Sequence, residues 1–156
     1  MKPAPFDYVR ASTVDEAVAA LAASNGEAKV LAGGQSLVPM LNFRIVDTPI
    51  FVDINGIQDL DRIEETTDGG LRIGALARHF ALETSDLVKD RFPVLQEAMK
   101  HVAHLAIRNR GTIGGSLSHA DPAAELPTMA VLLDAKIITA RASGGREIAA
   151  ADFFVA

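Results

Sequence analysis

The order of apolar and polar positions predicts a small βαβ unit at the start of the chain. Thr13 and Glu16 have the capping-box spacing in front of an alanine-rich run, so a helix is expected at 14–23, ended by the Ser-Asn-Gly step at 24–26. A short apolar run then predicts a strand, a short segment with a proline in its first turn predicts a helix, and a second apolar run predicts another strand. These three elements are expected at 29–31, 36–43 and 50–54.

The pattern beyond residue 55 predicts a different type of sheet. Residues 60–66 alternate loosely, 68–70 form an Asp-Gly-Gly turn and 71–74 return, which is typical of an antiparallel hairpin. Further helices are expected at 80–88, 93–102 and 123–133, with strands at 136–140 and 146–148 joined by the Ser-Gly-Gly turn at 143–145. We therefore predict an α+β protein with a βαβ N-terminal subdomain, 1–55, and a larger subdomain of mixed and antiparallel sheet, 56–156.

Composition narrows the classes of function. A chain of 156 residues buries roughly 70% of its unfolded surface and can fold without stabilising cross-links. It contains no cysteine, which excludes a disulfide framework, a thiolate nucleophile and a cysteine-ligated iron-sulfur cluster within the chain. The net charge of −5 is spread out, and there is one tyrosine and no tryptophan, so nucleic acid is not an expected partner.

Targeting signals are also absent from the apolar pattern. The first six residues contain no apolar signal core, and the best later apolar run, 129–133, stops at Asp134. We therefore expect no integral membrane segment and a cytoplasmic location.

Two glycine-rich segments carry the candidate chemistry. Each joins apolar residues to a Gly-Gly step and a hydroxyl, so the backbone can turn sharply and direct successive N–H groups at an anion, an arrangement called a nest. Either pair alone is explained as well by an ordinary tight turn, and neither has the spacing of a Rossmann or P-loop motif. Together they indicate a ligand with two phosphates, such as a nucleotide cofactor. The segments are Val30-Leu31-Ala32-Gly33-Gly34-Gln35-Ser36-Leu37 and Gly111-Thr112-Ile113-Gly114-Gly115-Ser116.

Histidines offer two weaker candidates. His101 and His104 lie three positions apart near Glu97 and could form a metal-binding face, but imidazoles at a helix C-terminus are also stabilised by the helix dipole. His119 and Asp121 could suggest acid-base chemistry, although no nucleophile lies at a recognisable spacing. We predict a contact with a cofactor or a role in loop structure for the second pair, and neither a catalytic residue nor a metal site.

Other side chains near the glycine segments also have two interpretations. Arg108 and Arg110 could neutralise a diphosphate or dock an acidic partner, or they could have a solvated or structural role. Met40, Leu41 and Phe43 are expected in the core rather than against a flavin. The aromatic pair at 153–154 is expected to anchor the end of the chain in the core.

The order of the motifs resembles a known family. The chain is similar to the FAD-binding medium subunits of molybdenum hydroxylases, such as the carbon monoxide dehydrogenase and xanthine dehydrogenase flavoproteins. The resemblance extends essentially from end to end. It rests on Pro5-Phe6-Asp7-Tyr8 with the following helix at 14–21, Ala32-Gly33-Gly34-Gln35-Ser36-Leu37, the run 107–116 ending in Thr-Ile-Gly-Gly-Ser, Asp121-Pro122-Ala123-Ala124-Glu125-Leu126-Pro127, and Asp152-Phe153-Phe154.

The resemblance implies a two-subdomain FAD-binding fold of the PCMH type. Both glycine segments would bind the pyrophosphate, and the flavin would lie between the subdomains. A carboxylate would be repelled by the diphosphate, so the acidic positions are expected at the sugar hydroxyls. The residues that match the binding segments are 30–37 and 112–116, and Ser118, His119, Asp121 and Glu125 match the adjoining region that faces the cofactor.

The resemblance also implies a division of labour. A large subunit with molybdopterin would oxidise the substrate, a small subunit would relay electrons through 2Fe-2S clusters, and FAD on this chain would pass them to an external acceptor. Assembly as a dimer of heterotrimers is a further expectation. The resemblance further implies a C-terminal domain beyond these motifs, and we expect that domain to be absent from this chain. The alternative is therefore a non-enzymatic interaction or assembly protein that keeps the fold without FAD. A third class, a self-contained flavin oxidoreductase, is disfavoured because no acid-base pair directed at a substrate can be named.

Overall fold

The computed structural model describes residues 2–154. The chain divides into two compact units, one of residues 1–58 with 139–146 and the other of residues 59–138 with 147–156. Met1, Val155 and Ala156, at the ends of the predicted subdomains, lie outside the described residues. Helices and short strands occur throughout, so the predicted α+β class is confirmed.

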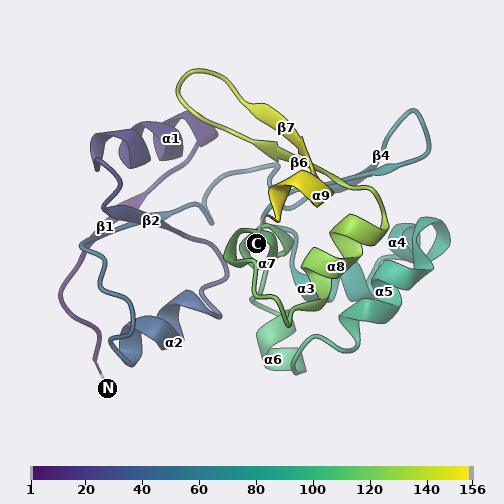
Figure 1. The fold of residues 1–156 in the computed structure, drawn as a ribbon, viewed down its shortest axis with the longest axis horizontal. Coiled ribbons are helices and arrows are strands. Elements are labelled where there is room, and N and C mark those ends of the chain that lie inside the picture. The colour runs from purple at the N-terminus through teal and green to yellow at the C-terminus, as the bar shows by residue number, and fades with distance from the viewer. Residues whose placement is uncertain (1, 155–156) are drawn as a thin grey trace. The chain divides into compact units, whose positions relative to one another are not determined.

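The first unit is a three-stranded parallel sheet with two helices. The sheet order is β1-β3-β2, and both outer strands run parallel to β3. Figure 1 shows α1 and α2 on opposite sides of this sheet, as right-handed crossover connections require. The predicted βαβ unit is β2-α2-β3. The elements are β1 (Asp7–Arg10), α1 (Val14–Ala23), β2 (Ala28–Leu31), α2 (Leu37–Asn42) and β3 (Ile50–Asp53).

Local signals explain the first helix and the central strand. The Thr13 hydroxyl accepts the Glu16 N–H at 3.1 Å, as the predicted capping box requires, and the Glu16 carboxylate accepts the N–H of Ser12 at 2.7 Å rather than that of Thr13. Phe51 and Val52 of β3 are fully buried, and the Phe6 ring packs edge-on against Phe51 with centroids 4.7 Å apart. The sheet is therefore anchored on its middle strand.

The second unit holds the predicted hairpin and most of the helices. β4 (Ile63–Glu65) and β5 (Leu71–Ile73) are antiparallel, with Ile63 opposite Ile73, as expected. β6 and β7 pair in another two-stranded sheet, and the segment joining them is counted with the first unit. The remaining elements are α3 (His79–Thr84), α4 (Asp86–Arg91), α5 (Pro93–Met99), α6 (Leu105–Arg108), α7 (Ile113–His119), α8 (Glu125–Leu132), β6 (Lys136–Thr139), β7 (Arg146–Ala149) and α9 (Ala150–Phe153).

Several helices differ from the predicted ranges. The helix expected at 80–88 is two helices, because Ser85 has an extended backbone and its hydroxyl caps α4 by accepting the Val88 N–H at 3.3 Å. The helix expected at 93–102 ends at Met99, and the one expected at 123–133 begins at Glu125.

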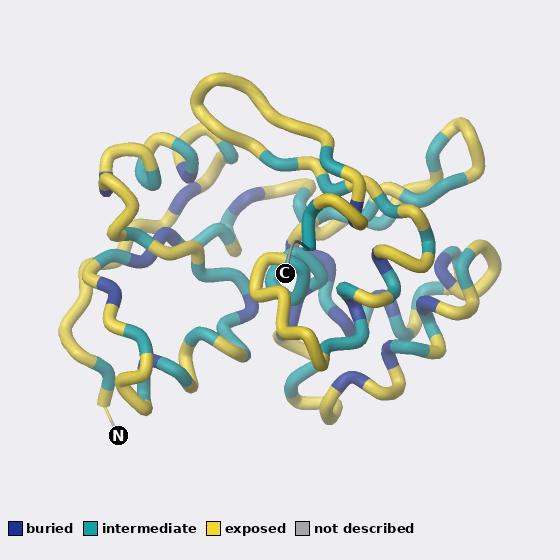
Figure 2. The backbone as a smooth tube through the Cα atoms, viewed as in Figure 1, coloured by how far each residue is buried: buried dark blue, intermediate teal, exposed yellow. Residues whose placement is uncertain are grey.

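The core of the second unit lies among its helices (Figure 2). The hairpin residues Ile63, Leu71 and Ile73 pack against it from β4 and β5. No helix within residues 2–154 is long and apolar enough to cross a membrane. The buried residues of this core are Leu82, Val88, Leu95, Met99, Val102 and Leu126.

Candidate functional site

The first glycine segment is the turn between the end of β2 and the start of α2. Val30 and Leu31 end the strand, and the helix begins at Leu37. Gly34 has φ +71°, a conformation that costs an L-residue about 1–2 kcal/mol. A Cβ at Gly34 would also lie 3.1 Å from Val38 Cγ2. This turn therefore depends on glycine at position 34.

The turn presents a row of unpaired backbone donors. Within residues 2–154, the N–H groups of Gly33, Gly34, Gln35 and Ser36 have no hydrogen-bond acceptor. Gly33 is buried, and buried N–H groups in folded proteins are nearly always paired. An acceptor supplied by a bound anion would pair these donors, so the first segment has the character of a nest.

Side chains from β1 and from the end of β3 hold this turn from its carbonyl side. Asn55 Nδ2 donates to Ala32 O at 2.8 Å and to Asp53 Oδ1 at 2.7 Å, and the Tyr8 hydroxyl donates to Asp53 Oδ2. Partial burial opposes ionisation of Asp53, but the hydrogen bonds from Tyr8 and Asn55 outweigh it and lower the pKa of this carboxyl. The network therefore keeps a charged carboxylate beside the turn.

Sequence reasoning missed this network. Asp53 is the last residue of the strand β3 and Asn55 lies two positions beyond it, and polar residues at the end of a strand are the one signal that could have revealed them. The role of Tyr8 depends on the pairing of β1 with β3. β1 was not predicted, because all four of its residues are exposed and carry no apolar pattern.

The second glycine segment is the capped start of α7, and the prediction of a backbone nest there is wrong. The Thr112 hydroxyl accepts the Gly115 N–H at 3.1 Å. Ile113 N–H donates to Ala77 O at 3.0 Å and Gly114 N–H to Ala75 O at 2.9 Å. These donors are occupied within the unit, so a ligand would meet the side chains of this segment.

Close packing explains the glycines of the second segment. A Cβ at Gly114 would lie 2.7 Å from both Cβ and O of Ala75. A Cβ at Gly111 would lie 2.8 Å from the His79 ring. A larger residue at either position would displace α7 from the chain beside it.

His79 is a buried group that sequence reasoning did not identify. It is 4% exposed, and its Nε2 lies 3.2 Å from Ser116 Oγ. Its Nδ1 is buried without a hydrogen-bond partner among the described residues. Burial lowers the pKa of His79 and outweighs the Thr112 backbone and the neighbouring Glu125 carboxylate, which act in the opposite direction. No spacing in the sequence connects His79 with Ser116, because 37 positions separate them.

The other predicted residues of the second unit lie at the end of α7 and the start of α8. Ser118 and His119 are in the exposed last turn of α7. Asp121 Oδ1 accepts the Ala123 N–H at 2.9 Å, which shapes the connecting loop. Glu125 is the first residue of α8. Residues 112–125 are thus brought together within one unit, and 30–37 within the other.

The residues considered for other binding roles form contacts with other side chains and with carbonyl groups of the chain. Arg108 pairs with Glu83 at 2.8 Å and also donates to Val102 O and Ala103 O, which supports the structural interpretation. Glu97 pairs with Lys100 at 2.6 Å. Groups of three or more metal-ligating side chains are not found within the described part of the chain.

Apolar residues near the glycine turn agree only in part with the prediction that they lie in the core. Leu41 is buried, as expected, but Phe43 is 64% exposed because it follows the last residue of α2. Phe153 and Phe154 are half-buried, with their rings edge-on at 5.1 Å.

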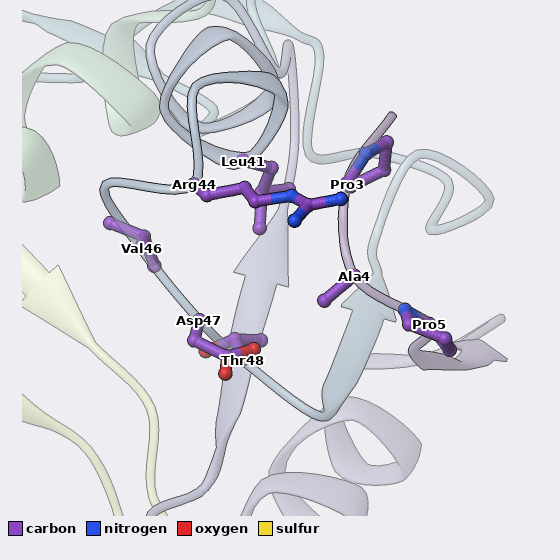
Figure 3. Close-up of a pocket in the computed structure, with 8 residues that line it drawn as sticks. All are labelled: Pro3, Ala4, Pro5, Leu41, Arg44, Val46, Asp47 and Thr48. Atoms are coloured by element: carbon purple, nitrogen blue, oxygen red, sulfur yellow. The ribbon is translucent and has the colours of Figure 1, made fainter. Parts of the chain in front are cut away.

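A pocket of about 360 Å³ lies elsewhere in the first unit. Figure 3 shows its lining from the N-terminal segment and from the connection between α2 and β3, with the Arg44 side chain extending across it. It adjoins the N-terminal ends of β1 and β3, whereas the glycine turn follows the C-terminal end of β2. None of the predicted site residues lines this pocket. The lining residues are Pro3, Ala4, Pro5, Leu41, Arg44, Val46, Asp47 and Thr48.

The sequence of this chain matches the model of a known protein family. Residues 4–156 match the model of the FAD-binding domain in molybdopterin dehydrogenase. The chain belongs to this family. The resemblance to the FAD-binding subunits of molybdenum hydroxylases is thereby confirmed.

Individual relatives are similar in sequence to this FAD-binding domain. The alpha subunit of the 6-hydroxypseudooxynicotine dehydrogenase complex of Paenarthrobacter nicotinovorans is 49% identical over 95% of this chain and 50% of its own length. The glyceraldehyde dehydrogenase medium chain of Sulfolobus acidocaldarius is 41% identical over 99% of this chain and 54% of its own. The chain therefore spans about half the length of these relatives.

A solved structure shows the same fold for the FAD-binding domain. Carbon monoxide dehydrogenase from Hydrogenophaga pseudoflava, in a form that lacks the Mo-pyranopterin moiety of the molybdenum cofactor, superimposes with a TM-score of 0.95. The two chains are 38% identical, and the match covers 99% of this chain and 54% of the other.

Proposed function

We propose that this FAD-binding domain holds the diphosphate of FAD through its first glycine segment, residues 30–37. The observation that carries the proposal is the row of N–H groups at Gly33, Gly34, Gln35 and Ser36 without an acceptor in the described chain. Hydrogen bonds to charged groups contribute about 1.5–3 kcal/mol each before the losses of association are subtracted. A diphosphate offers the negative charge and the several oxygens that such a row requires.

The second segment contributes side chains on this proposal. The Ser116 and Ser118 hydroxyls would donate to oxygens of the cofactor, and Thr112 would support them by capping α7. His119 would lie beside the cofactor at the end of the same helix. The carboxylates of Asp121 and Glu125 would accept hydrogen bonds from ribose or ribityl hydroxyls, because they would be repelled by the phosphates.

We further propose that the chain serves as the flavin subunit of a multisubunit molybdenum hydroxylase. Bound FAD supplies the ability to exchange electrons, and the protein supplies the binding site and its environment. The chain contains no cysteine, so 2Fe-2S clusters that deliver electrons to FAD would belong to a small partner subunit, and molybdopterin to a large one. An external acceptor would reoxidise the flavin. The same proposal includes a dimer of heterotrimers located in the cytoplasm.

Titration of the purified chain with FAD, followed by flavin absorbance and fluorescence, tests the binding site. We expect saturable binding of one FAD per chain and at least a tenfold loss of affinity in Gly34→Ala, because the added Cβ forces the turn out of its left-handed conformation; about 1.4 kcal/mol corresponds to tenfold. Absence of binding by the folded wild-type chain would instead favour the assembly protein without FAD.

Gly26→Ala is the matched control for this variant. Gly26 also has a positive φ, +89°, but a Cβ there meets nothing within 4 Å, and the residue lies outside the glycine turn. Both variants are expected to lose about 1 kcal/mol of stability, and only Gly34→Ala is expected to lose affinity for FAD. Equal FAD affinities in the two variants would overturn the proposed role of the turn.

A further inference from the structure

We propose that His79 is a positioning residue that orients the Ser116 hydroxyl so that its proton is directed at a phosphate oxygen of FAD. The inference rests on the proposed function and assigns a part in it to a residue outside the two glycine segments. Its basis is the contact of 3.2 Å between His79 Nε2 and Ser116 Oγ within one compact unit.

The backbone fixes the place of the His79 ring. His79 is the first residue of α3, and its N–H donates to Gly111 O at 3.0 Å. Its neighbour Arg78 forms an isolated antiparallel bridge with Thr112. The ring fills the space that glycine leaves at position 111, where a Cβ would lie 2.8 Å from the imidazole. His79 and the start of α7 are therefore held as one packed group.

The surroundings of the ring select one neutral tautomer. Nδ1 is buried and has no hydrogen-bond partner among the described residues. A proton on Nδ1 would make it an orphaned buried donor, which is rarer in proteins than an under-satisfied acceptor. A proton on Nε2 is instead used in a hydrogen bond to Ser116 Oγ. The neutral ring with its proton on Nε2 is therefore favoured.

Electrostatics around the ring agree with a neutral donor. Burial lowers the pKa of His79, and the nearby charges of Arg108 and Arg78 act in the same direction. The Thr112 backbone and the charge of Glu125 oppose them but are outweighed. The imidazole can therefore serve as a fixed neutral donor near pH 7.

A donated hydrogen bond from His79 determines what Ser116 can do. A serine hydroxyl has one proton to donate and two lone pairs that accept. When Oγ accepts from His79, its own proton remains available for another acceptor. The Ser116 N–H is already bonded to Thr112 O at 3.1 Å, so the hydroxyl is the group that this residue can offer to a ligand. A hydroxyl fixed in advance loses less freedom when the ligand binds.

A double-mutant cycle on FAD affinity tests the coupling. Ser116→Ala is expected to weaken FAD binding about tenfold, the effect of one hydrogen bond to a charged group. His79→Leu should cause a similar loss, and the double variant should lose no more than Ser116→Ala alone. His79→Gln, whose amide can donate at a similar position, should restore most of the affinity lost in His79→Leu. Additive losses, or wild-type affinity in a folded His79→Leu chain, would overturn the proposal.

A second measurement does not depend on the cofactor. Long-range ¹H–¹⁵N correlation NMR of the wild-type chain near pH 7 reports the tautomer of each histidine, and the His79 signals are assigned by their loss in His79→Gln. We expect a neutral ring protonated on Nε2. A ring protonated on Nδ1, or a charged ring, would overturn the proposal.

The outcomes separate this inference from the function on which it rests. If the wild-type chain fails to bind FAD, the proposed function fails, and the role of His79 fails with it. If the wild type and Gly26→Ala bind FAD, and His79→Leu binds equally well, only the role of His79 is overturned.

Discussion

Burial of the His79 imidazole connects the stability of the domain with pH. Because burial lowers the pKa of His79 below its usual 6.5, the unfolded chain binds a proton more readily than the folded chain as the pH falls. The free energy of unfolding therefore decreases as the pH drops through 6.5 towards the lowered pKa of the folded state. Above pH 6.5 the ring is neutral in both states, so this loss of stability vanishes. The groups facing the ring are Arg108 and Arg78, which act with burial, and Glu125, which acts against it.

His79→Gln is expected to reduce this pH dependence. Urea denaturation of the wild type and the variant between about pH 7.5 and 5.5 measures the free energy of unfolding across the window. The wild type should lose more stability than the variant over this interval. Equal slopes would show that His79 does not titrate in the way its burial requires.

The ion pair of Arg108 with Glu83 is expected to act in stability rather than in cofactor binding. The two side chains are only 14% and 20% exposed, and Arg108 also bonds two carbonyl groups. Glu83→Gln should lower the free energy of unfolding by about 1.5–3 kcal/mol in urea denaturation, because a charged hydrogen bond is lost from a mostly buried site.

Glu97→Gln is the matched control for that pair. Its ion pair with Lys100 is more than half exposed and screened by solvent, so the same exchange should cost much less stability than Glu83→Gln. Glu83→Gln should leave FAD affinity unchanged. A selective loss of FAD affinity in Glu83→Gln would instead support the alternative role of Arg108, which is to neutralise the diphosphate.

At the scale of the element, α7 depends on its cap. Thr112 is 2% exposed, and its hydroxyl accepts the Gly115 N–H. Thr112→Val keeps the shape but removes the acceptor, and it should cost about 1–2 kcal/mol of unfolding free energy. Thr112→Ser, which keeps the hydroxyl, should retain most of this stability. A larger loss in Thr112→Ser than in Thr112→Val would show that the methyl group rather than the cap holds the start of α7.

Local signals predicted the elements that local interactions stabilise. The capping box of α1, the βαβ unit and the β4–β5 hairpin all follow from spacing within a short stretch of chain. α7 was missed, because a Gly-Gly step disfavours a helix when it is considered alone. In the structure, distant carbonyls at Ala75 and Ala77 and the cap at Thr112 override that preference.

The candidate site, like the fold, could be predicted from the sequence only where its signals are local. The first glycine segment could be found, because Gly34 and its neighbours carry their own conformational signal. The contacts of Asn55 with Ala32 and of His79 with Ser116 join positions far apart in the sequence. A single sequence without a known fold contains no pattern that connects such positions.

At the scale of the whole molecule, the proposed function assigns a contact with FAD to each of two segments, 30–37 and 112–125. Hydrogen–deuterium exchange with and without FAD measures both segments in the unmodified chain. Peptides covering 30–37 and 112–125 should both exchange more slowly when FAD is bound, since binding suppresses local opening. The peptide at 66–72, which covers the turn of the β4–β5 hairpin, serves as a control and should not change. Protection confined to one segment would contradict the role proposed for the other.

The most direct test of the central claim is the dissociation constant of FAD for the wild-type chain and for a Gly34→Ala/Ser116→Ala double variant. Each substitution alters one of the two segments, and neither removes a residue from the apolar core. Flavin fluorescence titration should show one saturable site in the wild type and at least a tenfold weaker affinity in the double variant. A folded double variant that binds FAD as tightly as the wild type would contradict the account.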